Sequence, residues 1–127
     1  MYRYSSNVTF LYYNDLEYGS RFVEEVLDLK LTMDQGWAKV YQINKTSFLG
    51  IVRLNEEMEY KGNTLVSFNT SDVEKEYERV LKLDVFNLTE IKFFEKIPLK
   101  SFFFKDNEGH DFEIQQFIDE KDIEIFG

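Results

Sequence analysis

The chain has no cysteine, one proline and one histidine among its 127 residues. The absence of cysteine excludes disulfides, thiolate nucleophiles and cysteine-ligated metals, and it fits a reducing compartment. No apolar run reaches the roughly eighteen residues of a membrane span, and the N-terminus has no basic segment followed by an apolar one. We therefore expect a soluble cytoplasmic protein with no membrane partner.

Basic residues are also scarce, because 15 Lys and Arg stand against 24 Asp and Glu, which gives a formal net charge of −9. A nucleic-acid surface needs clustered Lys and Arg, so we expect no nucleic-acid partner. Aromatic residues are abundant at 17% of the chain, and hydrophobic residues make up 43%. This composition predicts one folded domain over residues 1–127 and favours a cationic or neutral ligand.

A pattern of strand followed by helix occurs twice. Residues 8–13 and 64–69 are rich in β-branched and aromatic side chains and predict strands. Each is followed by a helix-start pattern, with Asn14 and Ser71 as the expected N-cap residues. These two residues are 57 positions apart, and the apolar positions that follow keep the same spacing. The sequence therefore predicts an internal repeat.

Further strand-like segments follow both helices, and each half of the chain therefore reads as strand, helix and then strands. The expected strands are residues 37–43, 48–54, 101–105 and 111–115. The turn at 106–110 contains Gly109, where we expect a positive φ. The polar segment at 55–63 separates two modules of approximately 1–58 and 62–127.

In this arrangement the chain resembles the vicinal oxygen chelate superfamily, which includes glyoxalase I, extradiol dioxygenases, fosfomycin-resistance enzymes and bleomycin-binding proteins. The most specific match is residues 103–114, which resemble the family's C-terminal signature, with Asn107 where the family normally has proline. The resemblance implies an α+β fold. Two βαβββ modules would form a curved mixed sheet with a concave cleft, and the helices would cover the outer face.

In the family's metal enzymes, the resemblance implies one ligand on the first strand and one on the last strand of each module. These positions fall at Val8, Gly50, Leu65 and Glu113. Only Glu113 can coordinate, whereas a catalytic metal site generally uses about three protein ligands. We expect His110 to be exposed beside its turn, on the opposite strand face from Glu113. The sequence therefore predicts no metal and no cofactor, and it leaves open whether the protein is an enzyme.

If the implied ligand positions face the concave side, the period-two alternation of strands assigns their neighbours to the same face. A four-residue hairpin loop at 106–109 would add two phenylalanines to it. The predicted ligand-binding residues are Phe10, Tyr12, Trp37, Phe48, Ser67, Asn69, Phe102, Phe104, Asp111 and Glu113. Glu113 is also the candidate catalytic residue, because a carboxylate among aromatic side chains can act as a base.

Three functions remain open at this point. The first is a metal-independent binding protein that holds a small aromatic or cationic molecule in an aromatic-lined cleft. The second is a lyase, isomerase or dioxygenase of the same superfamily that uses Glu113 as base or metal ligand. The third is an interaction module whose aromatic face is a subunit interface. Since family members commonly pair, we expect a homodimer.

Overall fold

The computed structural model describes residues 2–55 and 64–127. The chain divides into two compact units, Met1–Lys61 and Gly62–Gly127. Of the polar segment expected to connect the modules, residues 56–63 lie outside the described residues. Within the part of the chain that is described, no helix is long and apolar enough to cross a membrane.

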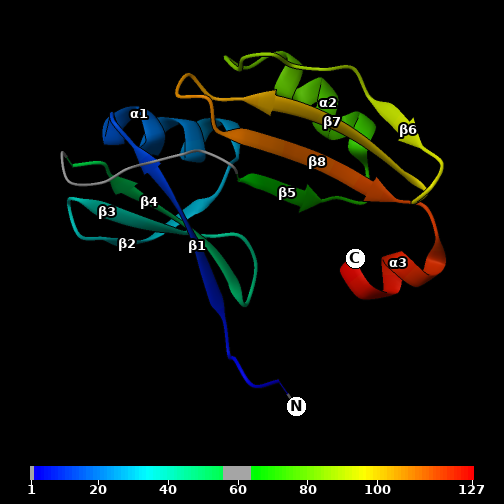
Figure 1. Ribbon diagram of the computed structural model, residues 1–127, viewed down its shortest axis with the longest axis horizontal. Helices are drawn as coiled ribbons and strands as arrows, with labels where there is room; N and C mark the ends of the chain where they lie inside the picture. Colours follow the sequence, from blue (N-terminus) through cyan, green and yellow to red (C-terminus); the bar gives the residue numbers. More distant parts are fainter. Residues whose placement is uncertain (1, 56–63) are drawn as a thin grey trace. The chain divides into compact units, whose positions relative to one another are not determined.

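The first module contains one helical segment and a four-stranded mixed sheet (Figure 1). Its elements are β1 (Asn7–Tyr13), α1 (Leu16–Arg21), the π-helix η1 (Phe22–Val26), β2 (Lys30–Asp34), β3 (Ala38–Gln42) and β4 (Ser47–Arg53). The strand order is β1-β4-β3-β2, with β1 parallel to β4 and the other pairs antiparallel. The last strand of the module therefore lies inside the sheet, next to the first.

The second module repeats this topology and adds a helix at its end. Its elements are β5 (Leu65–Asn69), α2 (Val73–Leu81), β6 (Lys92–Phe94), β7 (Leu99–Lys105), β8 (Asp111–Phe117) and α3 (Glu120–Phe126). The strand order is β5-β8-β7-β6, and β5 is parallel to β8. Two four-stranded mixed sheets with helices confirm the predicted α+β class and the two βαβββ modules.

Both helices after the first strands begin at an aspartate. Asp15 Oδ1 accepts a hydrogen bond from the backbone N–H of Tyr18, and Asp72 Oδ1 accepts one from that of Lys75, each at 3.1 Å. These N-caps lie one residue after the predicted ones, because the aspartates reach the free N–H groups of the first turn. The caps are again 57 residues apart, so the structure keeps the repeat spacing.

The core of the first module lies between its helical segment and one face of the sheet. The apolar residues Phe22, Val23 and Val26 of η1 are buried, and Gly19 brings the helix close to the ring of Tyr13. A Cβ at Gly19 would lie 2.9 Å from that ring, so this glycine permits the packing. The buried hydrophobic side chains include Leu11, Tyr13, Phe22, Val23, Val26, Leu27, Leu49 and Ile51.

In the second module, α2 covers one face of the sheet over β7 and β8 (Figure 1). Tyr77 of α2 meets Phe102 edge to face, with ring centroids 5.2 Å apart. Phe102 stacks on Phe104, and Phe104 stacks on Phe112 across the hairpin, at 6.0 and 5.6 Å. Leu81, the last residue of α2, is exposed. On the other face, α3 stacks Phe126 on a phenylalanine of β8.

Tyr41 of β3 is fully buried in the first module, and its hydroxyl makes polar contacts there. Its hydroxyl donates to Glu24 Oε2 at 2.7 Å and lies 3.2 Å from Ser20 Oγ. Burial is the main cause that raises the pKa of Tyr41 from 10.0 to about 12, and the Glu24 carboxylate raises it further. The phenol therefore stays protonated wherever the protein is folded near neutral pH.

This shift predicts a loss of stability in alkali. Since the folded state holds the Tyr41 proton more tightly than the unfolded state, the free energy of unfolding falls as the pH rises from 10 to about 12. The loss is on the order of 2–3 kcal/mol. Urea unfolding at a series of alkaline pH values should show a shallower decline for Tyr41→Phe. A Tyr2→Phe control changes an exposed phenol and should decline like the wild type; equal declines in all three proteins would contradict the assignment.

Candidate functional site

The register of the β7–β8 hairpin decides which phenylalanines face α2. Phe103 pairs with Glu113, which leaves five residues, 106–110, between the paired strand ends. The prediction that Phe102 and Phe104 share a face with Glu113 was therefore wrong. A loop one residue longer than expected shifts the register by one and sends alternate side chains to the opposite face. Phe102 and Phe104 belong to the core, and Phe103 takes their place beside Glu113.

The face of this sheet opposite α2 carries the remaining polar candidates of the second module. Two of them bind neighbours on the same face. Asn69 Oδ1 accepts a hydrogen bond from Gln115 Nε2 at 2.9 Å. Asp111 forms an ion pair with Lys105 across the hairpin. Both pairs are partly exposed, so they serve as surface contacts between strands.

Glu113 differs from these carboxylates because it is buried, with 8% of its surface exposed. Its Oε1 accepts a short hydrogen bond of 2.6 Å from the hydroxyl of Ser67, the residue directly beside it on β5. No Lys, Arg or His among residues 2–55 and 64–127 forms an ion pair with it. The parallel pairing of the first and last strands thus brings the two predicted residues Ser67 and Glu113 together.

A pocket of about 270 Å³ opens beside Glu113 within the second module. Aromatic and aliphatic side chains form most of its wall, and Glu113 is its one carboxylate. The residues that line it are Phe94, Lys96, Ile97, Leu99, Phe103 and Glu113. Apolar walls with a few polar groups are typical of small-molecule sites.

Sequence reasoning missed five of these six residues. The segment at 84–100 was not assigned to any element, because its alternation of apolar and polar residues is short. Phe103 was not among the predicted residues, because the expected hairpin register put Phe102 and Phe104 on the face of Glu113. One signal was available in the sequence. Phe94, Ile97 and Leu99 are apolar residues around the single proline, Pro98, which favours a turn between two short strands rather than a surface loop.

In the first module three of the four predicted aromatic residues lie on the sheet face opposite α1. Phe10 of β1 pairs with Gly50 of β4, and its ring covers the glycine, since a Cβ there would lie 2.4 Å from ring carbons. Phe48 and Tyr12 share this face and are partly exposed. Trp37 precedes β3 instead of lying in it and is 59% exposed. This face therefore presents aromatic carbon without a charged group among its predicted residues.

The residues at the four implied ligand positions do not fit a divalent metal. Val8 and Gly50 share one face of the first sheet, and Leu65 and Glu113 share one face of the second. Their combined donor set is one carboxylate. No group of three His, Cys, Asp or Glu side chains that could hold a metal ion occurs within the described part of the chain.

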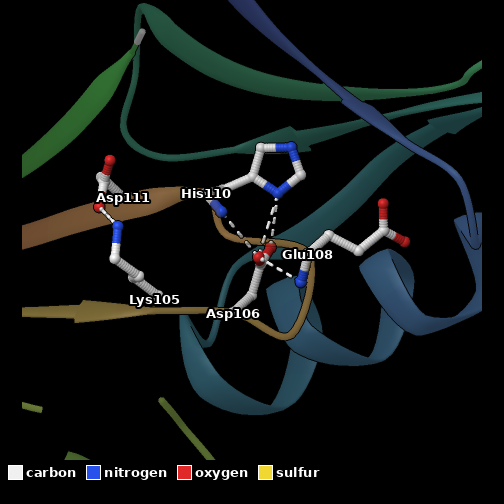
Figure 2. A network of polar contacts seen from close by, with 5 residues as sticks. All are labelled: Lys105, Asp106, Glu108, His110 and Asp111. Atoms are coloured by element: carbon white, nitrogen blue, oxygen red, sulfur yellow. Dashed lines mark hydrogen bonds and ion pairs between the residues drawn. The ribbon is translucent and has the colours of Figure 1, made fainter. Parts of the chain in front are cut away.

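The turn between β7 and β8 contains a buried polar network, shown in Figure 2. Asp106 Oδ1 accepts hydrogen bonds from the backbone N–H groups of Glu108 and His110, at 3.0 and 2.9 Å. Its Oδ2 lies 2.9 Å from Nδ1 of the His110 ring. The expectation that His110 is exposed was wrong, because it is 2% exposed and held by this carboxylate. Gly109 has the expected positive φ, 85°.

This network predicts a large stability effect at Asp106. Asp106→Ala removes the buried carboxylate that accepts from two backbone N–H groups and contacts the imidazole. This change should lower the free energy of unfolding by about 3 kcal/mol. Asp106→Asn should lose less and should move the His110 proton to the other ring nitrogen, which ¹⁵N NMR of the imidazole detects. Denaturant unfolding of Asp111→Ala is the control, because its half-exposed ion pair contributes less than about 1 kcal/mol. Similar losses at both aspartates would contradict the buried network.

The contact of Phe10 with Gly50 gives a second prediction. Gly50→Ala forces the ring away and should lower the free energy of unfolding by about 1 kcal/mol. In a Phe10→Ala background the same change should cost little, because the obstructing ring is gone. A double-mutant cycle measured by denaturant unfolding isolates this coupling. An equal cost of Gly50→Ala in both backgrounds would show that the ring does not determine the packing at this position.

Several solved structures of known proteins have a similar fold. No protein-family model matches the sequence, and no curated protein matches it. Lactoylglutathione lyase from Agrobacterium tumefaciens is 17% identical with a TM-score of 0.70, covering 86% of this chain and 90% of that one. The fosfomycin resistance protein FosX from Mesorhizobium loti is 23% identical with a TM-score of 0.68, covering 97% and 99%. A glyoxalase/bleomycin resistance protein/dioxygenase superfamily member from Sphaerobacter thermophilus is 14% identical with a TM-score of 0.73, covering 87% and 95%. The chain therefore has the fold of the vicinal oxygen chelate superfamily, as the resemblance in its sequence implied.

Proposed function

We propose that this chain is a small-molecule-binding protein of the glyoxalase/bleomycin-resistance type that works without a metal ion. The proposal places a small aromatic or cationic ligand in the pocket beside Glu113 in the second module. The observation that carries it is the buried Glu113 carboxylate, hydrogen-bonded by Ser67, in an otherwise mostly apolar pocket wall. One polar group in an apolar wall can orient a ligand while the wall supplies most of the burial.

Metal independence is supported by the donor set at the implied ligand positions. One carboxylate beside two aliphatic side chains and a glycine is far from the ligand number that a catalytic divalent ion uses. The homodimer and the cytoplasmic location expected from the sequence stay predictions.

A second candidate function is a metal-free lyase or isomerase that uses Glu113 as its base. It is favoured because this carboxylate lines the pocket, where it can touch a bound substrate. A base must lie within hydrogen-bond reach of the proton that it removes. Turnover that a Glu113→Gln variant retains in full would eliminate this role.

Ligand binding in the pocket can be tested by thermal shift against a panel of small aromatic and cationic compounds. A ligand that binds only the folded state stabilises it by about 2.7 kcal/mol at one hundred times its Kd, so a hit should raise the Tm in a saturable way. An Ile97→Trp variant, which fills the pocket, should remove this shift. Ile125→Trp changes an exposed isoleucine on α3, outside the pocket, and should retain it.

The proposal would be overturned if no compound stabilises the protein. It would also be overturned if the shift persists in Ile97→Trp. The second result would show that a compound binds elsewhere on the chain.

A further inference from the structure

Glu113 differs in its partner from the other carboxylates of the second module. Three carboxylates on its sheet and on α2 form ion pairs with a Lys or Arg of the same module. The pairs are Glu74 with Lys100, Glu76 with Arg79 and Asp111 with Lys105. Asp106, in the hairpin turn, instead accepts hydrogen bonds from two backbone N–H groups and contacts the His110 ring. Glu113 is as buried as a core residue, yet its partner is the neutral hydroxyl of Ser67. Removing a carboxylate from water is costly unless a cation compensates it.

The pocket offers space for such a cation next to Glu113. Lys96 lines the pocket, but its side chain is exposed and forms no ion pair with Glu113. Phe103 lies directly opposite Glu113 on the neighbouring strand. Side chains in such cross-strand pairs have Cβ atoms about 5 Å apart, so a cation at the carboxylate is also within reach of an aromatic ring, which attracts it.

We propose that the ligand of this pocket is a protonated amine carried on a compact apolar body. This inference rests on the proposed function and names the ligand class for the same pocket. The ammonium group donates to Glu113, beside Phe103, and the apolar body contacts Phe94, Ile97 and Leu99. The volume of about 270 Å³ lies below the range of about 300–1,000 Å³ that drug-sized ligands occupy. The body is therefore about the size of one aromatic ring with a short side chain.

The contacts of Glu113 also discriminate against other charged ligands. A guanidinium binds best when both carboxylate oxygens accept in parallel, and Oε1 of Glu113 already accepts from Ser67. An ammonium ion is a compact charge that needs only one free oxygen position. An anionic ligand would be repelled by the buried carboxylate. A divalent cation would find a single protein ligand.

Calorimetric titration of the full chain with benzylamine and with benzyl alcohol tests the inference. The two probes have similar shape, but only the amine is charged near neutral pH. We expect benzylamine to bind at least ten-fold more tightly, with an affinity that falls as salt is added. Glu113→Gln should reduce benzylamine binding by ten-fold or more and remove the preference. The matched control is Glu95→Gln, which removes the same charge from an exposed residue beside the pocket segment and should keep the preference.

The outcomes separate this inference from the proposed function. Equal affinity for both probes, lost in Ile97→Trp but unchanged in Glu113→Gln, would overturn the amine and leave a neutral-ligand pocket standing. Failure of both probes, together with failure of the wider panel, would overturn both proposals. Lys96→Gln should bind benzylamine at least as tightly as the wild type; a ten-fold loss would contradict the assignment of Glu113 as the cation's partner. Comparing benzylamine with benzyl alcohol on the wild-type chain needs no variant. It therefore tests the preference for an amine even if Glu113→Gln does not fold.

Discussion

The parallel pairing of the first and last strands of each module is the constraint on which the rest of the structure depends. Parallel neighbours need a long crossover, and here the crossover contains the helix and two further strands. The last strand is thereby enclosed between the first and third strands, with one face under the helix. In the second module this geometry buries Glu113 and sets it between Ser67 and Phe103. A carboxylate on an edge strand would instead be more exposed to solvent.

The charge of −9 has two different structural meanings in this protein. Many of the acidic side chains are exposed or paired with a neighbouring base, where they contribute little beyond solubility. Asp106 and Glu113 are buried, and each has a distinct role. Asp106 organises a turn by accepting from two backbone N–H groups and an imidazole. Glu113 accepts a hydrogen bond from the neutral hydroxyl of Ser67 and lines a pocket, which makes it the group available to a ligand.

Short sequence patterns correctly predicted two strands and two helix starts. The strands at 8–13 and 64–69 and the two helix starts were found because β-branched runs and capping residues act within a few positions. The elements β2, β6 and α3 were missed because their side chains are largely exposed and show no clear alternation. The face of Phe102 and Phe104 was predicted incorrectly, because one residue in the hairpin loop reverses every side chain of the strand. His110 was placed outside because nothing in its neighbours reveals the carboxylate that holds it.

The sequence by itself determined the fold class, the repeat of two modules and the loss of three of the four implied metal-ligand positions. The repeat follows from which residue type stands at which spacing, and the fold class and the implied ligand positions follow from the resemblance of that pattern to a known family. Only the tertiary structure decided which side chains Glu113 meets, that Phe103 rather than Phe102 lies opposite it, and that the turn segment around Ile97 completes the pocket. These contacts join residues from distant parts of the chain through strand register, and register is set by loop length and packing together rather than by any local pattern.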